Sequence, residues 1–248
     1  MTITTIDESQ RKAAKVAGLA YLISFATVVY VNFGIHGRLI VKNNAAETAR
    51  NILAHERLFR IGIAGDLIYC VGVVVLLTAL YVILEPVSRG LAFLAALWRL
   101  IWVLMWVAIT LHLFDALRLL RGSDYLQAFE AERLQALARF YVGTYDYYYV
   151  GLLFGASAST VCGYLWLKSR YIPRTLAIFG LITSAFCVAC TLVFYIFPHF
   201  DKIVNLDWFD MPMAIFDIAL SLWLLFKGLR PPAIADRATH DQAQAGAA

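Results

Sequence analysis

Long apolar runs separated by short polar stretches dominate this chain. A bilayer core of about 30 Å is crossed by about 20 helical residues at ~1.5 Å each, and each run is long enough for one crossing. The pattern therefore predicts an all-α fold, a polytopic membrane helix bundle with six transmembrane helices. The predicted spans cover about residues 16–36, 61–84, 90–118, 142–167, 175–197 and 209–229.

Two polar stretches between these runs carry apolar residues at helical spacing. One is AAETARNILAHERLFR, residues 45–60, and the other is DYLQAFEAERLQALARF, residues 124–140. Amphipathic segments of this kind are typical of helices that lie on a membrane surface. We expect both to be interfacial helices on the outer side of the membrane.

The six spans are expected to form a single transmembrane domain, residues 1–230. The remaining segment, residues 231–248, begins with two prolines and contains mostly small or polar residues. It has too few hydrophobic side chains to form a core, so the pattern predicts a disordered tail.

Composition supports a membrane protein and argues against a nucleic-acid-binding domain. The chain is 61% hydrophobic and 15% charged, with a mean hydropathy of +0.70, which a soluble domain does not have. The net charge of +4 is small, and the basic residues sit near the ends of spans rather than in one patch. We therefore expect membrane lipid as a partner and no nucleic acid.

The basic residues are balanced between the two sides of the predicted bundle, so their overall count does not set the orientation. The expected orientation therefore follows from the residues that flank the first helix. Arg11, Lys12 and Lys15 precede the first apolar run, and the link at residues 168–174 is also basic. Basic residues beside spans favour the cytoplasmic side. We expect both termini in the cytoplasm.

Three ionisable residues inside the predicted spans are candidate catalytic residues: Asp66, Arg99 and Asp217. A charge in a bilayer core is costly, so each is a hypothesis for a functional site. Counting residues from the span ends places Arg99 and Asp217 closest in depth, which predicts that they pair. Asp66 and Asp217 are also candidates for a general acid.

Further polar and aromatic residues are candidate ligand-binding residues, and three of them, His112, Asp115 and Asp146, are expected in the outer half of the bundle together with Asp66 and Asp217. The set is Trp102, Trp106, His112, Asp115, Tyr145, Asp146 and Tyr148. Two other interpretations stay open. Asp115 and Asp146 can lie at the headgroup level and be solvated, and the tyrosines can form an aromatic belt at the interface.

The sequence predicts neither a metal site nor a cofactor. His112 and Asp115 are three residues apart on one helix, but no matching second pair follows. Cys187 and Cys190 have CxxC spacing inside an apolar helix, where packing is the simpler interpretation and redox chemistry the alternative.

Two segments resemble an uncharacterised family of bacterial integral membrane proteins, domain of unknown function 4386. They are LFGASASTVCGYLWLKSRYIPRTLAIFGLI, Leu153 to Ile182, and ILAHERLFRIGIAGDL, Ile52 to Leu67. The resemblance covers about Arg11 to Leu229. It implies a six- or seven-span protein of the bacterial cytoplasmic (inner) membrane and transfers no catalytic residue.

Three classes of function remain open from the sequence. One is an enzyme or binder that acts on a lipophilic small molecule, such as a lipid or isoprenoid, by acid-base chemistry in a carboxylate-rich cavity. The second is a proton- or cation-coupled transporter that uses the same carboxylates. The third is a non-catalytic structural or sensory component. The sequence sets neither the oligomeric state nor whether the protein is an enzyme.

Overall fold

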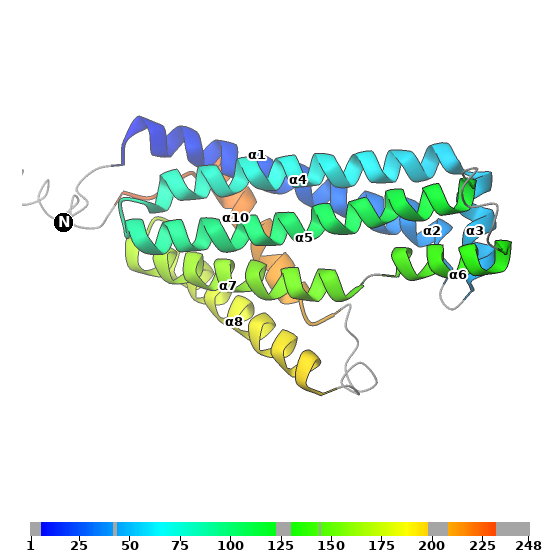
Figure 1. The fold of residues 1–248 in the computed structure, drawn as a ribbon. Coiled ribbons are helices and arrows are strands. Elements are labelled where there is room, and N and C mark those ends of the chain that lie inside the picture. The colour runs from blue at the N-terminus through cyan, green and yellow to red at the C-terminus, as the bar shows by residue number, and fades with distance from the viewer. Residues whose placement is uncertain (1–5, 42–43, 123–129, 144, 198–207, 232–248) are drawn as a thin grey trace, which may run out of the picture. The chain divides into compact units, whose positions relative to one another are not determined.

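The computed structural model describes residues 6–41, 44–122, 130–143, 145–197 and 208–231. Every regular element in those ranges is a helix and none is a strand, so the all-α prediction is confirmed for them (Figure 1). The helices are α1 (Glu8–Val29), η1 (Tyr30–His36), α2 (Gly37–Leu39), α3 (Ala45–Ala54), α4 (Glu56–Leu84), α5 (Arg89–Arg121), α6 (Ala131–Val142), α7 (Tyr145–Ser169), α8 (Arg174–Ile196) and α10 (Met211–Phe226). The predicted disordered tail lies almost entirely outside the described residues.

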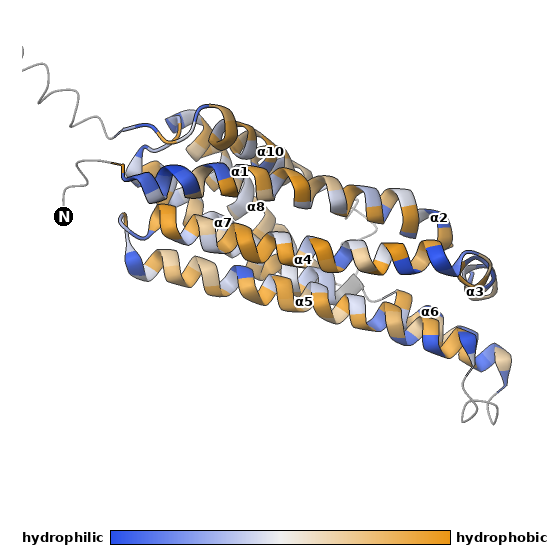
Figure 2. Ribbon diagram, turned by 90° about the horizontal axis from the view of Figure 1, so that it is seen from above, coloured by the Kyte–Doolittle hydropathy of each residue, from blue (hydrophilic) through white to orange (hydrophobic). Residues whose placement is uncertain are grey.

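Five helical segments are long and apolar enough to cross a membrane, as expected for a multi-pass membrane protein. Hydrophobic residues predominate along α4 and α5 (Figure 2). The sixth predicted span corresponds to α10, whose 16 residues are fewer than the usual length of a span, so the count of six stays a prediction. The five segments are Glu8–Leu39, Glu56–Leu84, Arg89–Arg121, Ala131–Ser169 and Arg174–Ile196.

The two predicted amphipathic stretches contain helices α3 and α6, which pack against each other (Figure 1). Asn44 caps α3, because its side chain accepts a hydrogen bond from the Glu47 N–H at 3.0 Å. The first stretch is divided at His55, since α3 ends at Ala54 and α4 begins at Glu56. The placement of α3 and α6 at the membrane surface stays a prediction.

The chain divides into two compact units. Unit 1 contains residues 1–22, 74–101 and 152–248, and unit 2 contains residues 23–73 and 102–151. Helices α1, α4, α5 and α7 each contribute residues to both units. The prediction of one transmembrane domain over residues 1–230 stays a prediction.

In unit 1 several helix ends meet at one place. The Gln10 side-chain amide donates to the Ile83 carbonyl at 3.1 Å and to the Tyr171 hydroxyl at 3.3 Å. The Arg230 backbone N–H donates to the Tyr171 carbonyl at 2.8 Å. These bonds bring together the start of α1, the end of α4, the α7–α8 link and the chain after α10. Within unit 1, α10 therefore leads back to the end from which α1 starts.

In unit 2 the π-helix η1 continues directly from α1 and ends at His36. Its buried residue Ile35 packs in a cluster with Phe59 and Ile63 of α4. A second cluster gathers Tyr69, Trp106 and neighbouring apolar residues of α4 and α5. The candidate site lies beside these two clusters, where His36 of η1 and Asp66 of α4 contact each other.

Candidate functional site

A buried hydrogen bond between two ionisable side chains connects the end of η1 with α4. The Nε2 atom of His36 lies 3.0 Å from Oδ2 of Asp66, and the two side chains are 9% and 3% exposed. Asp66 lies about three turns after the start of α4. Burying either ionisable side chain without a partner would cost free energy, and here each side chain is the partner of the other.

Glycines on α4 allow η1 to approach closely enough for this contact. A Cβ atom added at Gly62 would lie 2.8 Å from Cε1 of His36, and one added at Gly65 would collide with Val31. The π-helix adds to the effect, because its wider turn changes the direction of the residues that follow it, and such turns occur often at functional sites. The ring of His36 also meets Phe59 edge to face, with centroids 5.8 Å apart.

The second oxygen of Asp66 is bound as well. Nε1 of Trp106 donates to Oδ1 at 3.3 Å, and Trp106 is only 7% exposed. The Trp106 ring lies 4.8 Å from the Tyr69 ring, 5.4 Å from Trp102 and 5.9 Å from Tyr148, measured between centroids. Trp102 in turn donates to the Tyr69 hydroxyl at 2.9 Å.

We name these six side chains the Asp66 cluster: His36, Asp66, Tyr69, Trp102, Trp106 and Tyr148. Within it, imidazole and carboxyl groups can both gain and lose a proton, whereas the indole N–H of Trp106 only donates. The cluster can therefore hold a proton at the His36–Asp66 contact and surround it with aromatic faces.

The remaining candidates of unit 2 lie elsewhere. His112 is half-buried between the rings of Tyr141 and Tyr147, with centroids 5.1 Å and 4.9 Å away. The Asp115 side chain is 46% exposed and lies 3.8 Å from Arg118. Among the described residues, no hydrogen bond or ring contact joins either of them to Asp66. The side chains of Tyr145 and Asp146 lie outside the described part of the structure.

Unit 1 contains a second buried polar group, the Arg99 cluster of Tyr21, Arg99, Ser159, Cys162 and Asp217. Arg99 is 7% exposed and its Nη2 donates to Oγ of Ser159 at 2.9 Å. Its guanidinium carbon lies 6.0 Å from the centre of the Tyr21 ring.

The predicted partners Arg99 and Asp217 come near each other within unit 1. The Asp217 carboxyl interacts electrostatically with Arg99 and lies near the Tyr21 hydroxyl. Its Oδ1 atom is buried and has no hydrogen-bond partner among the described residues. The structure thus brings Arg99 and Asp217 into one cluster, while their pairing as a catalytic site stays a prediction.

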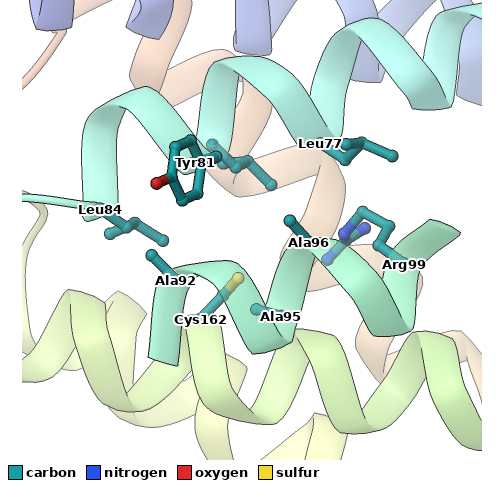
Figure 3. A pocket seen from close by; sticks show the side chains of 9 residues that line it. Leu77, Tyr81, Leu84, Ala92, Ala95, Ala96, Arg99 and Cys162 are labelled. Atoms are coloured by element: carbon teal, nitrogen blue, oxygen red, sulfur yellow. The ribbon is translucent and has the colours of Figure 1, made fainter. Parts of the chain in front are cut away.

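A small pocket lies beside Arg99 (Figure 3). Its walls are Leu77 and Tyr81 of α4, Ala92 and Ala95 of α5, and the Cys162 thiol of α7. It has room for about one water molecule. The pocket is therefore too small for a lipid or isoprenoid, and the larger carboxylate-rich cavity expected from the sequence stays a prediction.

Metal-binding geometry does not appear in the described ranges. Within them, no three His, Cys, Asp or Glu side chains converge on one point. The four cysteines are free thiols, and Cys70, Cys162 and Cys187 are buried.

Sequence reasoning missed five members of these clusters: His36 and Tyr69 of the Asp66 cluster, and Tyr21, Ser159 and Cys162 of the Arg99 cluster. His36 had a usable signal, because it is the first ionisable side chain other than tyrosine after Lys15 and ends an otherwise apolar run. The other four had none, since tyrosine, serine and cysteine are common in apolar helices for packing reasons.

None of the curated proteins matches this chain, and neither does any solved structure. A family model matches residues 16–228, which include all five candidate spans except the first turns of the first one. The resemblance drawn from the two sequence segments is confirmed, and the chain belongs to the family described as Domain of unknown function (DUF4386).

Proposed function

We propose that this integral membrane protein is a proton-coupled transporter and that His36 and Asp66 form its proton-binding pair. The observation that carries the proposal is the 3.0 Å contact between Nε2 of His36 and Oδ2 of Asp66, in side chains that are 9% and 3% exposed. Ionisable side chains at such depth in membrane proteins commonly form proton relays.

Proton binding at this pair is linked to packing. His36 ends η1, and Asp66 belongs to α4, so a change in their charges alters the attraction between the two elements. Gly62 leaves the ring of His36 directly against α4. A proton gained or lost at the contact therefore changes how η1 packs against α4. A coupled transporter requires a local structural change of this kind when it binds or releases a proton.

The proposed architecture has six crossings, with both termini on the cytoplasmic side of a bacterial inner membrane. The proposal is supported by the hydrogen bonds that join both the start of α1 and the chain after α10 to Tyr171. Because the two ends of the bundle lie together, the chain between them must cross the membrane an even number of times. Basic residues at this end favour the cytoplasmic side. Helices α3 and α6 are proposed to lie on the outer surface.

Tryptophan fluorescence during an acid titration in detergent tests the proton site. Trp106 donates to Asp66, so protonation of the carboxyl changes its environment. We expect a transition in the parent protein that Asp66→Asn and Trp106→Phe both remove. The matched control is Asp115→Asn, which changes a half-exposed carboxyl and should leave the transition intact.

Transport itself is tested with the protein in liposomes that contain a pH-sensitive dye. Proton entry driven by a pH gradient should be lost in Asp66→Asn and His36→Gln and retained in Asp115→Asn. A titration that persists in Asp66→Asn, or no proton entry in the parent, would contradict the proposal and leave a structural or sensory role.

The aromatic rings favour a second candidate function, the binding of a lipophilic small molecule next to Asp66. Trp102 and Tyr148 are half-buried and extend the rings around Trp106. Such rings provide apolar faces beside a carboxyl group that can act as a general acid. Asp217 with Arg99 is the corresponding candidate in unit 1.

Mass spectrometry of organic extracts from the purified protein tests this second function. A lipid or isoprenoid retained by the parent should be lost in Trp102→Leu and in Asp66→Asn. Trp98→Leu is the control, because Trp98 is a half-buried tryptophan on the same helix but outside the Asp66 cluster. Equal retention by all variants, or no retained molecule in the parent, would count against ligand binding.

A further inference from the structure

Five basic side chains gather at one end of unit 1, on the α7–α8 link and at the end of α10. The Arg230 N–H donates to the Tyr171 carbonyl at 2.8 Å, which holds the chain after α10 against the link. All five side chains are exposed. We name this surface the basic end: Lys168, Arg170, Arg174, Lys227 and Arg230.

The two segments that form the basic end carry only positive charges. Neither the link nor the last turns of α10 contain an acidic residue. The nearby ion pairs join Lys12 to Glu8 and Arg89 to Glu85, and so involve other cations. Among the described residues, no acidic side chain forms an ion pair with any member of the basic end. This surface is therefore strongly positive.

The link is held in place by its buried neighbours. Tyr171 and Ile172 are 0% and 1% exposed, and Gln10 donates to the Tyr171 hydroxyl. Arg170 has a φ of 58°, a conformation that favours glycine. Glycine would adopt this backbone conformation with less strain than arginine does. The presence of arginine here indicates that its side chain has a function.

We infer that the basic end binds the phosphate groups of anionic phospholipids. It lies at the ends of apolar helices, where a membrane protein meets lipid headgroups, and arginine matches the geometry of a phosphate group. The Arg230 guanidinium lies 4.7 Å from the centre of the Trp223 ring, and tryptophan prefers the headgroup level. This inference is independent of the proposed proton site.

Native mass spectrometry of the detergent-solubilised full chain tests the inference. Phosphatidylglycerol or phosphatidylcholine is added, and bound lipids are counted. The parent should bind more phosphatidylglycerol, and the triple variant Lys168→Gln, Arg170→Gln, Arg174→Gln should lose about fivefold in affinity for each cation removed. The control is Arg38→Gln, Arg50→Gln, Arg57→Gln, which removes the same charge from exposed residues of unit 2 and should retain the preference.

A single variant separates binding from folding. Arg170→Gly removes one cation and suits the positive φ, so it should unfold no more easily than the parent yet bind phosphatidylglycerol about fivefold more weakly. Added salt should weaken binding to the parent. Equal binding of the two lipids by the parent, salt-independent binding, or an equal loss in the control triple variant would overturn the inference.

Discussion

Asp66 and Asp217 are both carboxyl groups within apolar helices, but their surroundings differ. Both oxygens of Asp66 have partners, His36 at 3.0 Å and Trp106 at 3.3 Å. Oδ1 of Asp217 is buried without a hydrogen-bond partner among the described residues. Two hydrogen bonds hold the Asp66 carboxyl in one orientation towards a second titratable group. Asp66 therefore has the more defined geometry for exchanging a proton.

Gly62 is the residue on which the His36–Asp66 contact depends most directly. In Gly62→Ala the new methyl group would lie 2.8 Å from Cε1 of His36, so the ring must move away from its position beside Asp66. We expect the free energy of unfolding to fall by about 1–3 kcal/mol and the acid transition of Trp106 fluorescence to shift. Thermal unfolding in detergent and the fluorescence titration measure the two effects.

The control for this substitution is Gly90→Ala. A Cβ atom at Gly90 meets nothing within 4 Å, and the position is helical. Alanine there should leave stability unchanged or raise it by up to about 1 kcal/mol. If Gly62→Ala matches Gly90→Ala in stability and keeps the parent titration, the close approach of η1 to α4 has no role in the site.

The sequence could predict single members of the Asp66 cluster but not their pairing. Asp66 stands out because it is charged inside an apolar run, and Trp102 and Trp106 stand out as large aromatic residues near the middle of a span. The contact with His36 depends on the π-turn of η1 and on Gly62. Hydropathy does not reveal a π-turn, because the apolar pattern is nearly the same in either helix type.

At the scale of elements, close helix packing depends on glycine where backbone meets backbone. A Cβ atom at Gly163 of α7 would lie 2.9 Å from Cα and 3.0 Å from N of Leu181 in α8. A side chain can change its rotamer to relieve such an overlap, but backbone atoms cannot. The two helices would therefore have to move apart. Small residues at such contacts are typical of helix packing in membranes.

We therefore expect Gly163→Ala to be more destabilising than Gly62→Ala, where the obstacle is a side chain. The expected loss is about 2–3 kcal/mol in the free energy of unfolding. A thiol-reactive dye follows the lowered unfolding temperature during heating in detergent, because Cys70, Cys162 and Cys187 are buried and react only when the helices open, whereas the partly exposed Cys190 gives a constant background. Unfolding of Gly163→Ala at the parent temperature would show that α7 and α8 do not pack closely at this point.

At the scale of the whole molecule, the apolar runs were sufficient to predict the fold class and five candidate spans. They were insufficient for α10, because the apolar run at residues 209–229 extends beyond the helix Met211–Phe226 at both ends. A span prediction measures hydropathy, whereas the helix ends depend on local geometry, here a proline in the first turn and Gly228 with a φ of 66° after the last.

Whether α10 crosses the membrane decides between five and six crossings, and cysteine labelling tests it. Its 16 residues give a helix of about 24 Å, which is shorter than a core of about 30 Å. Local thinning of the bilayer and Lys227 reaching towards the headgroups can make up the difference. Within unit 1, α10 leads back to the end where α1 starts. We therefore expect six crossings.

A membrane-impermeant maleimide should label Trp208→Cys and Lys227→Cys from opposite sides of the membrane, and Ser9→Cys from the same side as Lys227→Cys. All three positions are exposed. The native cysteines lie within apolar helices, so the unmodified protein gives the background. Labelling of Trp208→Cys and Lys227→Cys from one side would mean that α10 enters the membrane without crossing it. The hydrogen-bonded end of unit 1 would then require a different path for α8, because Ser9 and Lys227 flank the same contacts with Tyr171.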